Sequence, residues 1–341
     1  MHNHTAVIIT TINKVSHNLL NISKNCKQNK WLFVLIGDKK SPKNFKIPYG
    51  KYFDISAQKK TNLSLANNLP LNSYSRKNIG YLVAIMNGAK NIIETDDDNF
   101  PYKSFFKQRQ EIHYANIPKC KGFFNLYKYC HDKNYNSSIW QRGLPFDEIE
   151  NKNKIKFYKK KIKPLVLQGL CDGDPDVDAI YRILNKKISH KFKKNINFGI
   201  TNKIFSPTNS QNTTWFYKSF PLMYLPTYCS MRATDIWRGY ISQVILNNNN
   251  NYTLFHGPNI KQIRNHHDLI KDLKDEFEVY KNSKNIVETL LDLDLKKGEK
   301  NFVDNLNKCY MQLCKRGFFH KRELKLLKYW INDLNFIFKA A

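Results

Sequence analysis

The chain has 341 residues, of which 41% are hydrophobic and 13% aromatic. This composition excludes a disordered chain and suffices for one large α/β domain, or for a domain with an appendage. Lysine and arginine number 56 against 28 aspartates and glutamates, giving a net charge of +28. We rank three explanations in this order: compositional drift in a chain rich in Asn and Lys, an anionic small substrate, and a nucleic-acid partner, because the lysines are scattered and form no long basic tail.

The first third alternates apolar, strand-like runs with helical patterns. Residues 6–11 and 31–38 are apolar and predict buried strands, and residues 51–56 predict a short one. Residues 76–89 carry a helical stripe that ends at Gly88, and residues 91–96 predict the next strand. Such repeats favour a parallel sheet with crossover helices, in which ligands bind beyond the carboxyl ends of the strands.

The middle of the chain is less regular. Residues 163–170 predict a strand, residues 172–187 an acidic turn feeding a helix, and residues 221–230 an extended segment. Residues 234–246 predict a helix capped by Thr234 or Asp235.

From His266 onward the pattern is helical and charged, and residues 324–338 repeat apolar side chains at spacings of three and four. We therefore predict a catalytic domain over residues 1–258 and a helical C-terminal region over residues 259–341 that packs on it. A helix that binds a partner or a membrane surface is the alternative.

Three consecutive acids, Asp96, Asp97 and Asp98, follow the predicted strand 91–96. Residues two apart in a strand point the same way, so Asp96 and Asp98 can share one target while Asp97 faces elsewhere. Carboxylate oxygens suit Mg²⁺ or Mn²⁺, which can neutralise a diphosphate leaving group. A solvated acidic turn is the alternative. The missing positive partner of the triplet is predicted to be a divalent ion.

Seven cysteines occur without a Cys-x-x-Cys pair, so neither a disulfide framework nor a zinc site is indicated. The first apolar run is too short for a signal peptide, and no segment approaches the ~20 apolar residues of a membrane span. We expect a soluble, cytoplasmic protein, with peripheral contact at a membrane surface left open.

Four stretches in order carry a family resemblance: "RKNIGYLVAIMNGAKNIIETDDDN", "GLCDGDPDVDAI", "LPTYCSMRATDIWRGYI" and "FHGPNIKQIRNHHDLIKDLKDE". Together they resemble the STELLO-type glycosyltransferases and, more distantly, the reversibly glycosylated polypeptides, which are UDP-arabinopyranose mutases. The resemblance implies a GT-A-like (Rossmann-like) α/β fold, with a mostly parallel sheet flanked by helices and a helical C-terminal extension.

The resemblance also assigns the donor side of a site. Thr10, Thr11, Asn13 and Asp38 would hold the nucleobase and ribose. Further donor-side residues would lie against the diphosphate and sugar, namely Arg76, Asn78 and Gly80, with Asp97 beside the metal pair Asp96 and Asp98. A surface cation is the alternative for Arg76, and a helix N-cap for Asn78.

On the acceptor side, the resemblance places Asp176 and Asp178 near the sugar or acceptor. It favours Asp235 as general base, with Trp237 as a wall of the pocket and Arg232 and Arg238 as anion-binding groups. His256 is the expected third metal ligand, with His266 and His267 as rivals. The alternatives are an N-cap role for Asp235 and a structural role for His256.

The resulting expectation is a Mn²⁺- or Mg²⁺-dependent glycosyltransferase with a nucleotide-sugar donor, most often UDP-linked, and an inverting displacement. The acceptor, whether glycan, lipid-linked or protein, is open, and no specific nucleic acid is expected. A nucleotidyltransferase or a nucleotide-sugar mutase is the first alternative. A basic, non-enzymatic nucleic-acid binder is the second alternative. It would explain the net charge of the chain, but it would leave the acid triplet unexplained.

Overall fold

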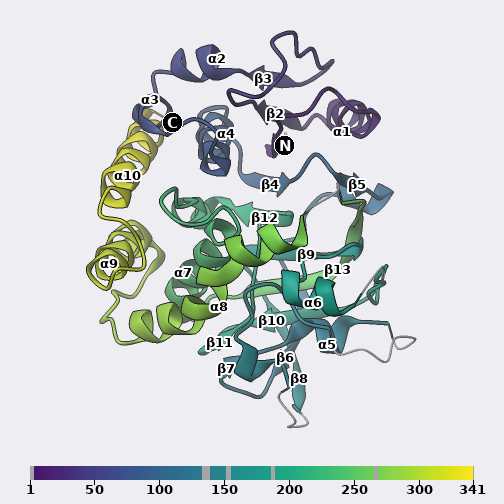
Figure 1. Cartoon of the computed structure of the whole chain (residues 1–341), viewed down its shortest axis with the longest axis vertical. Coiled ribbons are helices and arrows are strands. Elements are labelled where there is room, and N and C mark those ends of the chain that lie inside the picture. The colour runs from purple at the N-terminus through teal and green to yellow at the C-terminus, as the bar shows by residue number, and fades with distance from the viewer. Residues whose placement is uncertain (1–3, 133–138, 151–154, 186–188, 265–267, 341) are drawn as a thin grey trace.

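The computed structural model describes residues 4–132, 139–150, 155–185, 189–264 and 268–340. Within these residues, one large sheet of 11 strands runs through the molecule, and two short strands pair separately (Figure 1). The strands are β1 (Thr5–Thr10), β2 (Leu32–Ile36), β3 (Lys51–Phe53), β4 (Asn91–Thr95), β5 (Asn99–Pro101), β6 (His113–Pro118), β7 (Gly122–Phe123), β8 (Phe157–Ile162), β9 (Val166–Gly173), β10 (Asn197–Ile200), β11 (Ile204–Phe205), β12 (Asn212–Phe216) and β13 (Thr253–Gln262).

Helices cover both faces of this sheet and continue beyond it at the C-terminal end (Figure 1). They are α1 (His17–Gln28), α2 (Ile55–Lys59), α3 (Ser64–Asn68), α4 (Lys77–Met86), α5 (Leu126–Cys130), α6 (Ala179–Leu184), α7 (Thr234–Asn248), α8 (Leu269–Leu291), α9 (Phe302–Lys315) and α10 (Glu323–Ala340). The segment predicted to be extended begins instead with the end of a 3-10 helix, η4 (Tyr217–Met223).

Strands β1, β2 and β4 are buried on both faces, as their apolar runs predict, whereas the short β3 at the edge of the sheet is exposed or half-buried. Alternate side chains of β1 face opposite sides, with Ala6 and Ile8 packed in the core that contains α4. Val7 and Ile9 belong to a second core that contains the apolar side chains of α1. The two helices therefore clamp β1 from opposite sides and fix the position of its carboxyl end.

The order of strands creates the place for a site. The sheet runs β3-β2-β1-β4-β12-β9-β13-β10-β6-β8, and the pairs among the first four strands are parallel. The chain moves outward from β1 to β3 and then returns to the other side of β1 with β4. This reversal leaves a crevice beyond the carboxyl ends of β1 and β4, where open α/β sheets bind ligands.

The second half of the sheet is mixed. Strand β12 is antiparallel to both β4 and β9, whereas β9 and β13 are parallel. The predicted α/β class is confirmed, with helices on the sheet and a helical C-terminal part. The antiparallel pairs were not foreseen, because β12 is a short polar run in the sequence.

The C-terminal helices pack on the body of the protein, as the apolar stripe of residues 324–338 predicts. Helix α10 contacts α3 and α4, and α9 contacts α7 and η4. The predicted boundary after residue 258 falls within β13. Among the described residues, no helix combines the length and the apolar character needed to cross a bilayer.

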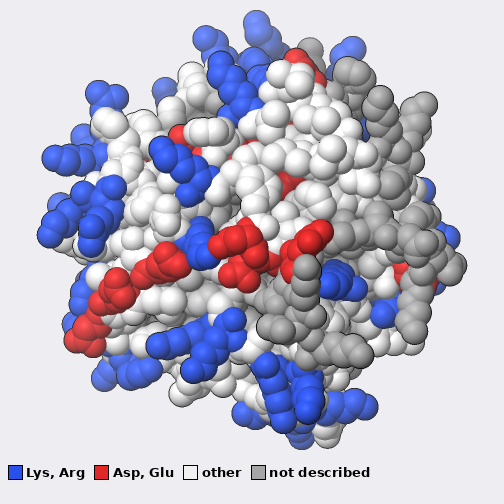
Figure 2. Space-filling model, turned by 60° about the horizontal axis from the view of Figure 1, so that its bottom comes forward, with Lys and Arg blue, Asp and Glu red and all other residues white. Residues whose placement is uncertain are grey.

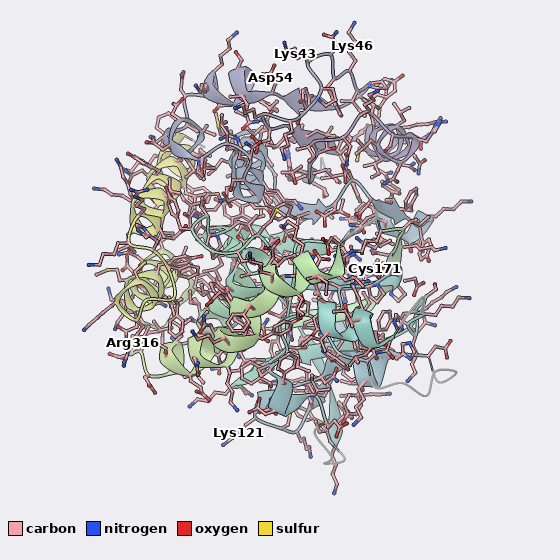
Figure 3. All side chains as sticks on the ribbon, viewed as in Figure 1. Lys43, Lys46, Asp54, Lys121, Cys171 and Arg316 are labelled. Atoms are coloured by element: carbon pink, nitrogen blue, oxygen red, sulfur yellow. The ribbon has the colours of Figure 1, made fainter. Side chains whose placement is uncertain are left out.

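Charged side chains are spread over the surface. In Figure 2 a band of acidic side chains crosses the face shown, with lysine and arginine on both sides of it. Lys43, Lys46, Lys121 and Arg316 extend from the periphery, whereas Cys171 lies inside the body (Figure 3). All seven cysteines fall in the described residues and none forms a disulfide, as predicted.

A buried ion pair joins the two halves of the sheet to α7. The Arg238 guanidinium donates to both carboxylate oxygens of Glu94, at 2.9 and 2.7 Å, and neither side chain is more than 2% exposed. The Trp215 indole N–H donates to Glu94 Oε1 at 2.8 Å, and the Tyr81 hydroxyl to Oε2. Arg238, which the family resemblance placed among anion-binding groups, is instead committed to this internal contact.

We predict that Glu94→Gln lowers the free energy of unfolding by about 3 to 5 kcal/mol, because it leaves the Arg238 charge buried and unpaired. The control is Glu299→Gln, which breaks a largely exposed pair with Lys218 and should cost less than about 1 kcal/mol. Urea denaturation measures both. Equal losses in the two variants would contradict the structural role of the buried pair.

Candidate functional site

A cavity of about 530 Å³ opens beyond the carboxyl ends of β1, β2 and β4. It collects predicted residues from both halves of the chain, namely Thr10, Thr11, Asn13, Asp38, Arg76, Asp96, Asp97, Asp98, Asp176, Arg232 and Asp235. Asn78, Gly80, Asp178, Trp237 and His256 are not among its lining residues. The convergence of strand ends thus produces a single hollow, as the parallel topology predicts.

The three adjacent aspartates have different partners. Asp97 accepts hydrogen bonds from the Thr11 hydroxyl at 2.5 Å and the Asn13 side-chain amide at 2.9 Å. Its backbone carbonyl accepts from Asn18 of α1 at 3.1 Å. Asp97 therefore ties the segment after β1 to the end of β4, and its carboxylate faces away from the targets of its two neighbours.

Asp96 has a cationic partner that the sequence did not reveal. Lys77 is fully buried, and its ammonium lies 3.0 Å from Asp96 Oδ1. It also donates to the Tyr74 hydroxyl, the Thr95 carbonyl and the Ser210 carbonyl at 2.8 to 3.2 Å. Burial raises the pKa of Asp96, and Lys77 opposes that rise. Lys77 is thus one positive partner of the triplet that the sequence analysis did not predict, and the divalent ion stays a prediction.

Asp98, like Asp97, has no charged hydrogen-bond partner in the part of the chain described. The Gln262 side-chain amide donates to its Oδ2 at 2.9 Å, whereas its Oδ1 is buried and has no hydrogen-bond partner among the described residues. Burial and the charge of Asp96 raise its pKa to about 6. A buried carboxylate oxygen without a partner is the feature expected of a cation ligand.

Few other metal-binding side chains accompany these acids. Within the described ranges, no group of three His, Cys, Asp or Glu side chains is arranged to hold a metal ion. A magnesium-type site with two carboxylates and oxygens from a bound phosphate remains compatible with this arrangement, since Mg²⁺ is commonly held in that way.

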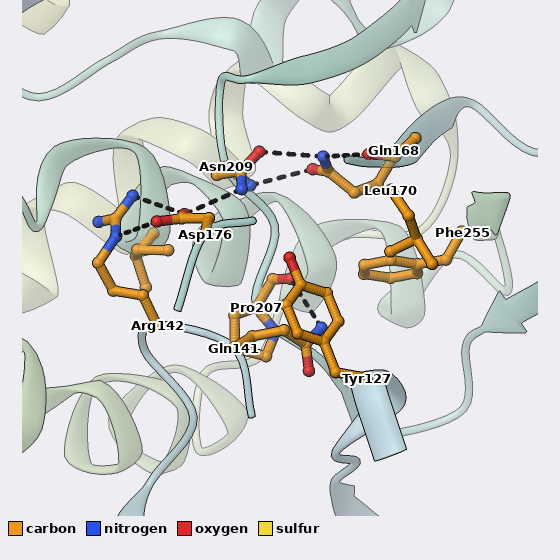
Figure 4. Close-up of a pocket in the computed structure, with 11 residues that line it drawn as sticks. Tyr127, Gln141, Arg142, Gln168, Leu170, Asp176, Pro207, Asn209 and Phe255 are labelled. Carbon is orange, nitrogen blue, oxygen red and sulfur yellow. Dashed lines mark hydrogen bonds and ion pairs between the residues drawn. The ribbon is translucent and has the colours of Figure 1, made fainter. Parts of the chain in front are cut away.

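Arg142 links the two acids of the opposite wall. Its guanidinium makes two 2.8 Å bonds to Asp176 (Figure 4). It also contacts Asp235 at 3.1 to 3.2 Å and is largely buried. Arg142 and Asn209 help to lower the pKa of Asp176 to about 2. Both Asp235 oxygens accept from Arg142.

Asp235 is not the cap of its helix. Helix α7 begins at Thr234, and the residue at the cap position is Ala233, without a side-chain hydrogen bond. Besides its bonds to Arg142, Asp235 Oδ2 accepts from the backbone N–H and the hydroxyl of Ser210, both at 3.3 Å. Asp235 and Ser210 both line the cavity.

The donor-side residues divide into two kinds. Asp38 accepts backbone N–H groups of Lys39, Asn72 and Ser73, and so shapes the cavity rim. Arg76 is buried rather than a surface cation. It donates to Gln58 and to the Leu69 carbonyl, while its Nη2 has no partner among the described residues. Burial lowers the pKa of Arg76.

Asn78 and Gly80 do not line the cavity and have structural roles. Asn78 is neither an N-cap nor a cavity residue, because its side-chain amide pairs with the backbone N–H and carbonyl of Leu225 at 2.8 Å each. A Cβ at Gly80 would lie 2.6 Å from Ile8 Cγ2 and 3.0 Å from Ile36 Cγ1. Gly80 thus allows α4 to pack closely on β1 and β2, which corrects its predicted place at the diphosphate.

Two acceptor-side predictions are corrected in the same way. Asp178 is the N-cap of α6, accepting the Tyr181 N–H at 2.7 Å and the Trp140 indole N–H at 2.6 Å. Burial raises its pKa to about 6. Trp237 lies in the core against Phe319 and does not wall the cavity.

His256 does not approach the acid cluster. It stands near the start of β13, where its Nδ1 donates to the Gly257 carbonyl at 2.8 Å. The β13 residue that contacts Asp98 is Gln262, six positions further along the strand. The predicted ligand role of His256 is therefore corrected, and His266 and His267 lie outside the described residues.

The fold and the cavity define an α/β protein with an acid-lined crevice at a topological switch point, the class in which nucleotide-type ligands bind beyond the strand ends. The sequence model of the family described as "STELLO glycosyltransferases" matches residues 232–340. That segment runs from the cavity residues Arg232 and Asp235 through the C-terminal helices.

Two plant proteins align with nearly the whole chain. The chain is 26% identical over 326 residues to "Probable glycosyltransferase STELLO2" of Arabidopsis thaliana. It is 25% identical over 326 residues to "Probable glycosyltransferase STELLO1" of the same plant. Each alignment covers 89% of this chain and 41% of the relative, so the chain spans less than half the length of the relatives it matches. These matches confirm the resemblance to the STELLO-type family.

A solved structure described as "Crystal Structure of a Mycobacterial Protein" aligns with a TM-score of 0.40 at 6% identity. The alignment covers 82% of this chain and 74% of the other. No function is transferred from it.

We predict that His256→Gln flattens the pH dependence of stability. Burial and the nearby Arg109 lower the pKa of His256 from 6.5 to about 4, so the unfolded chain binds the proton more readily. The stabilisation of the folded state by neutral His256 is present in full above pH 6.5 and is lost as the pH falls towards 4. Replacing His256 should reduce the slope of the free energy of unfolding against pH by up to about 1.4 kcal/mol per pH unit.

Urea denaturation at several pH values checks this, with His17→Gln at an exposed position as the control for losing a histidine. Parallel curves for the wild type and His256→Gln would show that burial does not keep His256 neutral.

Proposed function

We propose that the protein is a metal-dependent glycosyltransferase that moves a sugar from a nucleotide-diphosphate donor, UDP-linked in the first instance, to an acceptor hydroxyl. The observation that carries the proposal is the cavity at the strand ends, with Asp96 and Asp98 on one wall and Asp98 Oδ1 buried without a partner among the described residues. The names of the two plant relatives, both probable glycosyltransferases, agree with it.

The nucleotide is proposed to lie along the ends of β1 and β2. Thr10, Thr11 and Asn13 line that side of the cavity and, together with Asp38, surround a space for the base and ribose. The buried Nη2 of Arg76 offers one guanidinium donor towards an anionic group on this side. A guanidinium is suited to phosphate oxygens because it is planar and permanently charged.

Asp96 and Asp98 are proposed to hold Mn²⁺ or Mg²⁺, with the remaining ligands supplied by the donor. When bound, the ion would neutralise the diphosphate that leaves and so favour cleavage of its bond to the sugar. Lys77 already offsets the charge of Asp96, and Gln262 orients Asp98. Lys77 and Gln262 would thus keep the carboxylates of Asp96 and Asp98 in position, and Lys77 would reduce the electrostatic repulsion between them.

The acceptor is proposed to enter beside Asp235 and Asp176 on the opposite wall. Asp235 would take the proton of the acceptor hydroxyl while the hydroxyl oxygen forms a bond to the anomeric carbon and the diphosphate departs. Arg142 holds both acids in place. Attack from the side opposite the diphosphate would invert the configuration at that carbon.

The proposal predicts selective stabilisation by donors. A thermal-shift panel of UDP-, GDP- and CDP-sugars is measured with and without Mn²⁺, and UDP-sugars with Mn²⁺ should raise the melting temperature by several degrees, since ligand at about 100 times its Kd adds roughly 2.7 kcal/mol. The panel contradicts the proposal if no nucleotide sugar stabilises the protein in a metal-dependent way.

We further predict that Asp98→Asn weakens Mn²⁺ binding in the presence of UDP at least about tenfold, since the partnerless oxygen loses its charge. Isothermal titration measures the affinity. Asp294→Asn, an exposed acid outside the cavity, is the matched control and should bind as the wild type does. An unchanged Mn²⁺ affinity in a folded Asp98→Asn variant would show that Asp98 is not a metal ligand.

A further inference from the structure

Helix α10 carries two buried acids that are not part of the cavity. Glu323 stands at its first position and Asp333 ten residues later, about 15 Å along the helix axis. Glu323 is 0% exposed and Asp333 5% exposed. Buried carboxylates are unfavourable unless hydrogen bonds satisfy them, so the contacts of these two acids show what the helix holds.

Glu323 binds the segment that leads into α7. Its two oxygens accept the backbone N–H of Thr227 at 3.0 and 3.1 Å and that of Tyr228 at 2.7 Å. The Tyr224 hydroxyl donates to Glu323 Oε1 at 2.5 Å. These donors are separated from Glu323 by almost one hundred residues, so the acid fixes residues 224–228 from outside the sheet.

Asp333 binds the start of α3 in a similar way. Its Oδ1 accepts the Ser64 N–H at 2.9 Å, and its Oδ2 accepts the Leu65 N–H at 2.8 Å. Helix α3 ends at Asn68, and the carbonyls of the next two residues accept from Arg76. Asp333 therefore anchors the base of the segment 69–76.

Both anchored segments run directly into the cavity. Asn72, Ser73, Tyr74 and Arg76 line it from the first segment, and the second continues to Met231, Arg232 and Asp235. The two segments also touch, because the Thr227 hydroxyl donates to Ser75 Oγ at 2.8 Å. Asn78 binds the backbone of Leu225, two residues before the first backbone N–H that Glu323 binds.

We propose that α10 is a positioning element of the site, in which Glu323 and Asp333 set the two cavity segments 69–76 and 224–233 against each other. The carboxylates act through these segments and touch no ligand themselves. Charge-assisted bonds to backbone N–H groups fix the main chain, which apolar packing of a helix alone does not do. Loss of either acid should loosen one segment and leave the strands unchanged.

Hydrogen exchange followed by mass spectrometry tests this in the full chain without any ligand. Glu323→Gln should speed exchange of the amides in residues 224–233 about tenfold or more, and Asp333→Asn should do so in residues 61–76. Peptides from β1 and β4 should exchange as in the wild type. The matched controls are Glu288→Gln and Asp294→Asn, which replace exposed acids of the same types.

A second measurement separates positioning from stability alone and rests on the proposed function. In each α10 variant the affinity for UDP with Mn²⁺ should fall about tenfold, while the melting temperature without ligand changes much less than in Glu94→Gln. If the wild type binds no UDP, the proposed function fails, but the exchange experiment still decides the role of α10.

The proposal is overturned if exchange rises evenly over the whole chain, or if neither anchored segment responds to its own acid. Should Glu323→Gln fail to fold, Glu323→Asp keeps the charge and is expected to speed exchange in residues 224–233 by a smaller factor. A folded Glu323→Asp variant without that local change would equally overturn it.

Discussion

The ion pair of Glu94 and Arg238 is the constraint on which the site depends. Glu94 lies on β4, two residues before Asp96, which directly follows the strand, and Arg238 lies three residues after Asp235 on α7. Residues two apart on a strand share a face, and residues three apart on a helix are neighbours. The pair therefore fixes the spacing between the metal-type acids and the acid of the opposite wall. Loss of either partner would leave a buried charge unpaired, so the pair disfavours other arrangements of β4 and α7.

Several acids around the cavity are likewise paired with cationic side chains of the protein itself. Lys77 faces Asp96, and Arg142 faces both Asp176 and Asp235. Asp98 accepts from the neutral amide of Gln262, and burial raises its pKa to about 6. The protein thus balances several of its site acids with its own cations. Among the described residues, Asp98 Oδ1 is left as a buried carboxylate oxygen for which a ligand-borne cation would be the natural partner.

The sequence predicted the parts of the molecule that depend on local pattern. Apolar runs located β1, β2 and β4, and the rule that ligands bind at strand ends brought Thr11, Asp38 and the acid triplet together. It did not predict Arg142, because its partners lie 34 and 93 residues away and no local spacing marks them. Asn78 and Gly80 were misplaced because a helix next to a site also carries residues that face the body of the protein.

The C-terminal helices show why a change in the residue pattern along the sequence is a poor guide to a domain boundary. The texture changes near residue 258, yet β13 continues through Gln262 and contributes the amide that orients Asp98. Beyond it, the carboxylates of α10 bind backbone N–H groups of residues 64–65 and 227–228. Nearly every residue has the same backbone N–H group, so the sequence of the bound segment does not show that a distant carboxylate binds it. The cavity is therefore shaped by a helix that lines no part of it.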